Sequence, residues 1–128
     1  MSITYEKSTD KNLKETMDAL QSNLKNNGFG VLWHLNFKDK LEEKGLELKD
    51  DYFVLEVCNP KEAKQLLDFN IHIGTILPCK VIVRRDNDKT YIGMISPEVL
   101  IGLFKNPELD DLAKKLDASL KDSIDASL

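Results

Sequence analysis

Phe-Val-Leu-Glu-Val-Cys-Asn-Pro, residues 53–60, is the stretch that decides the fold. Residues 52–58 are apolar or aromatic apart from one glutamate. They are too few for an amphipathic helix, so they predict a buried central strand. Asn59 then provides an N-cap, and Pro60 suits the first helical position. The stretch therefore predicts a strand that carries Cys58 to the first turn of a helix.

The segment after this helix predicts a return strand and a hairpin. Cys79 opens an alternating stretch at residues 79–85, and a turn at residues 86–88 leads into a further strand at residues 90–95. We interpret the first of these strands as the parallel partner of the central strand in a strand-helix-strand unit. In such a unit Cys58 and Cys79 lie at opposite edges of the sheet, which disfavours a disulfide, whereas an antiparallel return strand would bring them together.

The N-terminal part of the chain predicts a short strand, a helix, a second strand and a short helix. Residues 8–10 resemble a helix cap, and apolar residues then recur at helical spacing across residues 13–24 until Asn27-Gly28 ends the helix. The period changes to two at residues 29–37, which predicts a strand with one fully apolar face. Residues 38–44 predict a short charged helix.

The C-terminal part predicts two helices, because Pro97 and Pro107 each follow a short polar cap residue and precede an acid. The second helix becomes too polar after about Ser119 for its end to be placed. Together these elements predict a single α+β domain over residues 1–128. Its mixed sheet of about five strands has its more apolar face covered by helices, in two layers.

Composition excludes several classes of function. The chain has 128 residues, enough to fold around its own core, and a formal net charge of −4. Nucleic acids and anionic membranes need clustered basic residues, so neither is expected as a partner. No apolar run reaches the length of a membrane span, and the N-terminus lacks the apolar core of a signal peptide. We therefore expect a cytoplasmic protein whose two cysteines are reduced.

Four blocks of sequence resemble the domain of unknown function family 302, a family of small α+β proteins. They are Gly28-Phe29-Gly30-Val31, Cys58-Asn59-Pro60-Lys61, Ile73-Gly74 and Leu77-Pro78-Cys79-Lys80-Val81. The resemblance covers most of the chain, although the stretch at residues 70–73 departs from the more apolar approach that the family usually shows before the fourth block. It implies a mixed sheet with packed helices and a dimer, and it implies no activity.

Cys58 is the leading candidate for a functional side chain. A helix N-terminus stabilises a thiolate, so Cys58 is a candidate nucleophile or ligand, and Glu56 on the same strand face is a candidate proton acceptor. Asn59, Cys79 and His34 are further candidates for ligand binding. The opposing interpretation is that Cys58 is a small hydrophobic residue packed near the helix start.

No metal or cofactor is expected. The two cysteines with His34 and His72 are ligand types used by zinc and copper, but their spacing matches no metal motif. Neither a phosphate-binding glycine loop nor a nucleophile-elbow serine is present in the sequence. Whether the protein is an enzyme stays open at this point.

Two functions from different classes remain. The first is a non-catalytic dimeric binding or interaction module, and the second is a thiol-based or small-molecule site around Cys58. A homodimer is expected because the second face of the strand at residues 29–37 is half apolar. Gly30 and Leu32 lie there beside His34 and Asn36, and we expect Ile92 and Met94 to extend that surface.

Overall fold

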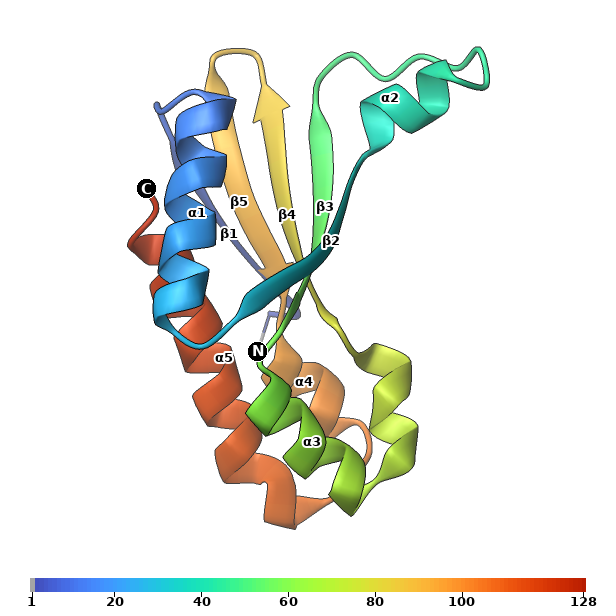
Figure 1. Ribbon diagram of the computed structural model, residues 1–128, viewed down its shortest axis with the longest axis vertical. Coiled ribbons are helices and arrows are strands. Elements are labelled where there is room, and N and C mark those ends of the chain that lie inside the picture. Colours follow the sequence, from blue (N-terminus) through green and yellow to red (C-terminus); the bar gives the residue numbers. More distant parts are fainter. Residues whose placement is uncertain (1) are drawn as a thin grey trace.

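The computed structural model describes residues 2–128 of the chain. Five strands alternate with five α-helices and two 3-10 segments (Figure 1). In chain order they are β1 (Thr4–Thr9), α1 (Leu13–Asn26), β2 (Gly30–Asn36), α2 (Phe37–Glu42), β3 (Tyr52–Cys58), α3 (Pro60–Phe69), η1 (Ile71–Ile76), β4 (Cys79–Asp86), β5 (Lys89–Ile95), α4 (Pro97–Gly102), η2 (Pro107–Leu109) and α5 (Asp110–Asp125).

The strands form one sheet in the order β1-β5-β4-β3-β2. This confirms the predicted α+β class with five strands. Every neighbouring pair is antiparallel, so the expectation of a mixed sheet with a parallel strand-helix-strand unit was wrong. The reason is that α3 and η1 together form an excursion beyond the end of the sheet and return the chain to the end at which β3 finished (Figure 1).

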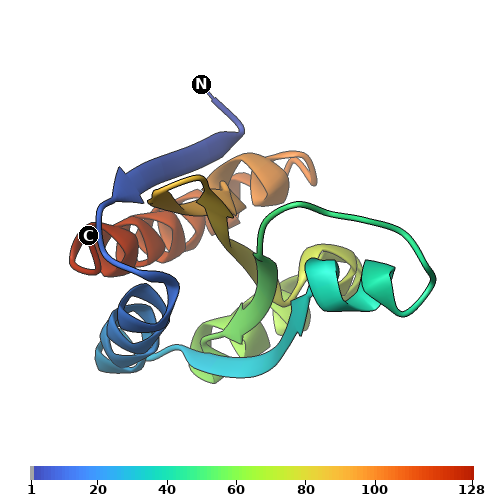
Figure 2. The ribbon, with the colours of Figure 1, turned by 90° about the horizontal axis from the view of Figure 1, so that it is seen from above.

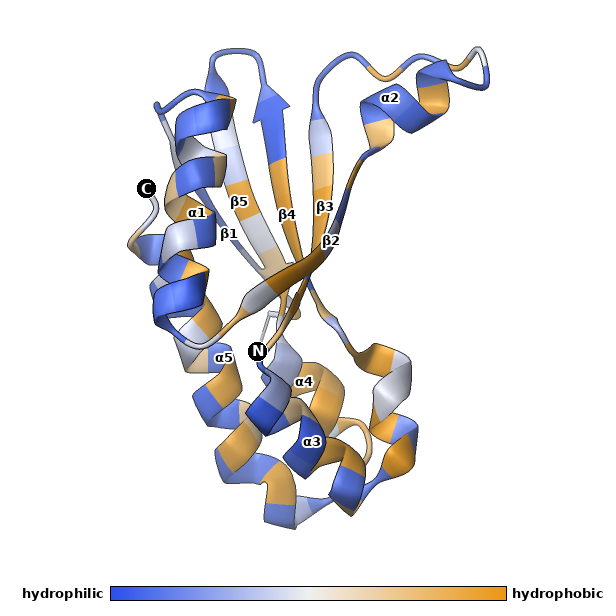
Figure 3. Cartoon of the chain, in the orientation of Figure 1, coloured by the Kyte–Doolittle hydropathy of each residue, from blue (hydrophilic) through white to orange (hydrophobic). Residues whose placement is uncertain are grey.

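Helices cover one face of the sheet and leave the other open. Seen from above, α1 and α5 lie on one side of the strands (Figure 2). Fully buried side chains from both helices and from the three central strands form the core between these layers. They include Leu20, Leu24, Leu55, Val57, Val81, Val83, Ile92, Leu120 and Ile124. Apolar residues run along the middle of β2, β3 and β4 and alternate with hydrophilic ones along α1 and α5 (Figure 3).

Helix α1 ends as predicted but begins later. Its N-cap is Asn12 rather than a residue of the cluster at 8–10, and Asn12 forms a capping box with Glu15. The cluster is unavailable for capping because β1 pairs with β5 as far as Thr9. At the other end, Gly28 has a φ of 86°, and the amide of Phe29 bonds back to the helix.

Strand β2 lies at an edge of the sheet and is irregular. The pairing with β3 shifts between Val31 and Trp33, which leaves Leu32 as the extra residue of a β-bulge. The predicted alternation fails there, and both Leu32 (60%) and Trp33 (52%) are exposed. Ile92 and Met94 are buried at 0% and 3% exposure in the core, so the expectation that they extend an exposed surface beside β2 was wrong.

Helix α5 runs further than its polarity suggested, to Asp125. Ser123 and Ser127 are buried because their hydroxyls accept hydrogen bonds from side-chain amides of α1, at 2.7 Å from Asn27 and 3.0 Å from Asn23. The start of this region also differs, because η2 opens it and Asn106 makes no capping side-chain bond. Between residues 2 and 128, no helix has both the length and the apolar character needed to cross a bilayer.

Candidate functional site

A cavity of about 570 Å³ opens on the uncovered face of the sheet, at the end where η1 and α4 meet the strands. Its walls are mainly apolar and its few polar side chains come mostly from the strands. The strands contribute Thr4, Tyr5, Glu6, Tyr52, Cys79, Lys80, Ile82, Gly93, Met94 and Ile95, and the segments around η1 and α4 contribute Thr75, Ile76, Leu77, Pro78, Pro97, Leu100 and Ile101.

The strand register explains why the sheet is hollow at this place. Ile82 of β4 pairs with Gly93 of β5, which in turn pairs with Glu6 of β1, so these three residues cross the floor in one row. Gly93 contributes no side chain. A Cβ placed on it would lie 3.4 Å from both Glu6 and the backbone of Tyr5, which is ordinary contact. The glycine therefore provides space without being required by strain.

The charged groups on this face are paired. Lys80 Nζ lies 2.5 Å from Glu56 Oε1, across the register that joins β4 to β3. Arg84 donates two hydrogen bonds to the carboxylate of Glu6, at 2.9 and 3.1 Å, and this raises the pKa of the guanidinium. Glu56 thus has the partner that a carboxylate in an apolar strand needs, and the mouth of the cavity carries ion pairs.

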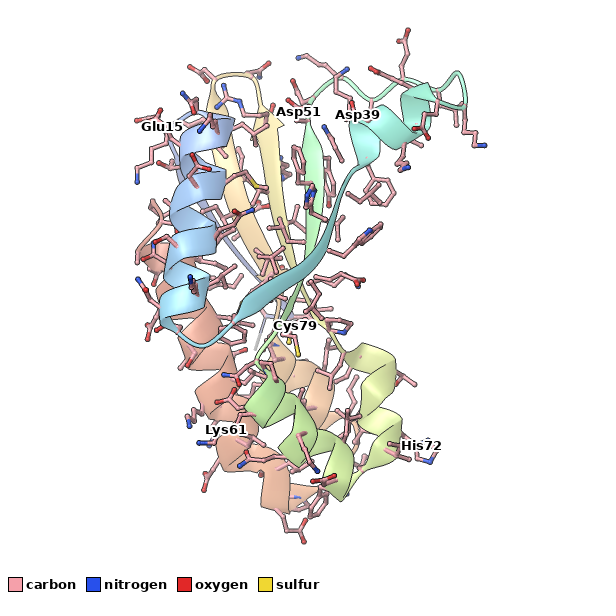
Figure 4. The ribbon with its side chains drawn as sticks, in the orientation of Figure 1. Glu15, Asp39, Asp51, Lys61, His72 and Cys79 are labelled. Carbon is pink, nitrogen blue, oxygen red and sulfur yellow. The ribbon has the colours of Figure 1, made fainter. Side chains whose placement is uncertain are left out.

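The structure brings Cys58 and Cys79 together, contrary to the expectation from a parallel unit. Cys79 pairs in register with Val57, the residue next to Cys58, because β3 and β4 are antiparallel. Cys79 lies where the sheet meets the lower helices (Figure 4). Both cysteines are free thiols and both line a second cavity of only about 10 Å³. That volume accommodates about one water, so no organic molecule fits inside this second cavity.

Burial makes both thiols poor thiolates. It raises the pKa of Cys58 and raises that of Cys79 to about 12, where the negative charges of Cys58 and Glu62 add to the effect. The positive end of the α3 dipole therefore does not offset the rise that burial causes in the pKa of either thiol. Cys58 is half-buried and Cys79 is 9% exposed, so solvent reaches the former more readily.

Asn59 is the N-cap of α3, as predicted, and Glu62 lies in the first turn of that helix. Asn59 Oδ1 accepts a hydrogen bond from the amide of Glu62 at 3.2 Å. Glu62 is 5% exposed, a burial that its capping position did not suggest. Its Oε1 lies 3.6 Å from Lys115 Nζ, and its Oε2 has no hydrogen-bond partner. Asn59 and Glu62 thus hold the helix start beside the cysteines.

The histidines lie apart from the cysteines. His34 is exposed on the edge strand β2, with its ring centroid 6.3 Å from that of Phe53. His72 is exposed in η1 and points away from the body of the protein (Figure 4). Within residues 2–128, no three His, Cys, Asp or Glu side chains gather closely enough to hold a metal ion.

Sequence reasoning missed the large cavity because its walls come from segments far apart in the chain. The one local signal was Gly93, an isolated glycine within a strand, which often marks a place where a ligand or a backbone approaches closely. Ile82 faces the same space, but its position in an alternating strand carries no sign of a cavity. Cys79 alone among the predicted site residues also lines this cavity.

Comparison with known proteins gives one family. The model of the family described as "Domain of unknown function DUF302" matches residues 5–127. A crystal structure of an uncharacterized conserved DUF302 protein from Bacillus stearothermophilus superimposes with a TM-score of 0.95 at 37% sequence identity, covering 100% of both chains. A search of curated proteins found no match.

Proposed function

This chain belongs to the DUF302 family, which is described only as a domain of unknown function, and from the geometry of its site we propose that it is a homodimeric, non-catalytic binding module. Its ligand is a compact, uncharged and mainly apolar molecule, such as a substituted aromatic ring. The single observation that carries this proposal is the apolar cavity of about 570 Å³. We further propose a cytoplasmic location, on the sequence evidence given above.

The dimensions and chemistry of the cavity support this class of ligand. Its volume falls in the range of about 300–1,000 Å³ that is usual for small-molecule sites. The charged side chains at its mouth, Lys80 and Glu6, are each committed to an ion pair with a partner on the same sheet face. A charged ligand would have to break one of these pairs, whereas an apolar ligand gains by leaving water. Tyr52 and Thr4 offer hydroxyl groups to a polar substituent.

The cavity lining supports binding rather than catalysis. Catalysis by a side chain needs an activated nucleophile or a free acid or base beside the ligand. The thiol of Cys79 has its pKa raised to about 12, and the carboxylate of Glu6 is held by Arg84. The thiol is therefore a weak nucleophile towards a ligand in the cavity, and the carboxylate is not a free base.

A neutral apolar dye, N-phenyl-1-naphthylamine, tests the ligand site by its fluorescence increase in an apolar environment. Ile82→Trp fills the floor of the cavity, and we expect it to weaken dye binding at least tenfold. Ile71→Trp is the matched control, because Ile71 is 72% exposed and does not line the cavity. Equal dye affinity in the two variants, or no binding to the wild type, would overturn the proposal. Leu100→Trp blocks the same cavity from α4 if Ile82→Trp fails to fold.

The proposed dimer interface is centred on β2. Leu32, Trp33 and Phe37 are exposed at 60%, 52% and 39%, in one run of edge strand and helix start. Clustered apolar side chains of this kind are characteristic of interaction surfaces. We expect light scattering to give twice the 14.6 kDa of one chain. Trp33 is the one tryptophan in the sequence, so its emission should shift to shorter wavelength as concentration rises.

Introducing a charge at the centre of this surface tests the dimer independently of the ligand site. Trp33→Lys should yield a monomer that still binds the dye. Gln21→Lys, on an exposed position of α1, is the control for added charge. A wild-type protein that remains at the mass of one chain at micromolar concentration would refute the dimer.

A further inference from the structure

The end of β3 and the start of β4 place the two cysteines on neighbouring antiparallel strands. Cys79 pairs with Val57, so Cys58, the next residue of β3, lies diagonally across from it. Alternation along β3 turns the Cys58 side chain to the other face of the strand, but both cysteines line the same small cavity at the strand end. Strands pair with opposite Cα atoms about 4.5–5.5 Å apart, and residues rise about 3.4 Å along a strand, so a diagonal pair is separated by about 6 Å. Disulfides join Cα atoms about 4.4–6.8 Å apart. The backbone spacing therefore lies within the disulfide range, and closure requires the Cys58 side chain to turn towards Cys79.

The space around the two cysteines is too small for a bound organic molecule. Cys58 and Cys79 line the same cavity of about 10 Å³, together with Ala63 and Leu66 of α3 and Leu116 of α5. This space is too small for an organic substrate. It does leave room for a sulfur atom to rotate, which a densely packed core would not.

The two thiols differ in accessibility in the way that a two-step exchange requires. Cys58 is half-buried, so a small reagent reaches it from solvent. Cys79 is only 9% exposed, so a reagent in solution reaches it poorly. Its neighbour on the adjacent strand is Cys58. The accessible thiol is thus placed to react first and the buried one to displace the product.

We propose that Cys58 and Cys79 form a dithiol that exchanges with low-molecular-weight disulfides and closes to an intramolecular disulfide. Cys79 also lines the apolar ligand cavity and Cys58 does not, and neither proposal depends on the other. It assigns a shared role to two residues that the sequence had placed at opposite edges of the sheet.

The exchange balances in two displacements. Cys58 loses its proton to solvent, and its sulfur attacks one sulfur of the small disulfide. The disulfide bond breaks, and the first small thiol leaves and takes up a proton. Cys79 then loses its proton and attacks the sulfur of Cys58, which releases the second small thiol. The two protein thiols are oxidised, and the small disulfide is reduced to two thiols.

The raised thiol pKa values set the pH dependence of this reaction. Only the thiolate attacks, and burial raises the pKa of both cysteines. The rate of exchange should therefore increase with pH throughout the range from 7 to 9. The carboxylate of Glu62 adds to the cost of a charge on Cys79, so Glu62→Gln should speed the second displacement.

Oxidised glutathione tests the proposal on the folded chain, with intact-mass spectrometry after acid quenching. We expect the wild type to lose two hydrogens, with a peptide that joins residues 58 and 79. Cys79→Ser should accumulate a stable glutathione adduct on Cys58. Cys58→Ser should remain unmodified for far longer than the other two proteins. A stable adduct on the wild type, or no reaction by it, would overturn the proposal.

Two controls keep the result interpretable. Circular dichroism establishes that each variant is folded, and Cys79→Val replaces Cys79→Ser if the buried hydroxyl prevents folding. The wild type alone also decides the question, because a linked peptide that forms only in urea would show that the native fold keeps the thiols apart. The dye affinity of Cys58→Ser should equal that of the wild type, since Cys58 does not line the large cavity.

Discussion

Replacing Asp117 tests whether a buried carboxylate holds one wall of the large cavity in place. Asp117 lies on α5 and is 3% exposed. Its Oδ1 accepts the hydroxyl of Ser96 at 2.6 Å, and its Oδ2 lies 2.8 Å from Lys121 Nζ. Ser96 is the N-cap of α4, where its Oγ also accepts the amide of Val99 at 3.2 Å. Asp117 therefore fixes the start of the helix that walls the cavity.

The contacts of Asp117 set the size of the expected effect. A hydrogen bond to a charged group contributes about 1.5–3 kcal/mol. The ion pair adds under about 1 kcal/mol, because the Lys121 side chain is 40% exposed. Asp117→Ala should lower the free energy of unfolding by about 3 kcal/mol. Asp117→Asn retains the shape and one acceptor and should cost about 1–2 kcal/mol.

Urea unfolding followed by circular dichroism measures these changes. With a slope of about 1–3 kcal/mol per molar in urea, Asp117→Ala should lower the midpoint by about 1–3 M. Asp122→Ala, at an exposed position of the same helix, should change stability by less than about 0.5 kcal/mol. The dye affinity should fall in Asp117→Ala, because α4 loses its anchor. Equal midpoints for Asp117→Ala and Asp122→Ala would refute the reasoning.

The same residue predicts a dependence on pH. Burial by itself raises the pKa of Asp117. Hydrogen bonds from Lys121 and Ser96 lower this pKa by more than burial raises it, so the pKa lies below its ordinary value. A lowered pKa means that the carboxylate stabilises the fold above the unfolded-state pKa of about 3.9. The difference in stability between wild type and Asp117→Asn should therefore be full at neutral pH and should shrink as the pH falls below about 4.

Three further changes test the fold. Leu66→Ala removes a side chain with 0% exposure and should cost about 2–5 kcal/mol in urea unfolding. Gly28→Ala should cost about 1–2 kcal/mol because the φ of 86° is left-handed, whereas Gly30→Ala, which meets no atom within 4 Å, should leave the melting temperature unchanged. Tyr5 donates a hydrogen bond to Asp125 at 2.6 Å, and this bond, with burial, raises the pKa of Tyr5 to about 12. Tyr5→Phe should abolish an absorbance transition near that pH, and the stabilisation from this bond should be lost as the pH rises from 10 towards 12.

Local sequence patterns predicted most helices and strands, but they did not predict the relative direction of neighbouring strands. The mainly apolar run at Tyr52–Cys58 and the cap at Asn59 define a strand and a helix start by chemistry that acts over a few residues. Whether the next strand runs parallel depends on where the intervening helix packs, and a ten-residue helix is compatible with either direction. The error in direction carried over to the cysteines, which it separated although the fold joins them.

The remaining errors came from side chains whose polarity did not match their burial. Ser123 and Ser127 are buried because amide groups from another helix satisfy their hydroxyls, which no pattern within α5 reveals. Asp117 is likewise buried because its carboxylate has polar partners, which are the Ser96 hydroxyl at the start of α4 and the Lys121 ammonium on its own helix. Leu32 shows the converse error, because one extra residue in β2 reversed the faces that a strict period of two assigns.

The two edges of the sheet differ, and this difference limits how far the protein can assemble. Strand β1 presents an exposed and largely polar edge with Glu6 and Lys7, which deters another strand from adding there. Strand β2 presents the apolar side chains, but its bulge at Leu32 interrupts the ladder of backbone groups that a growing sheet would extend. In a symmetric contact each copy uses the same apolar patch, so the patches of both copies are buried together. No apolar patch then remains for a third copy to bind. The proposed association through β2 would therefore close on itself as a symmetric pair, and both edges of the sheet disfavour fibre growth.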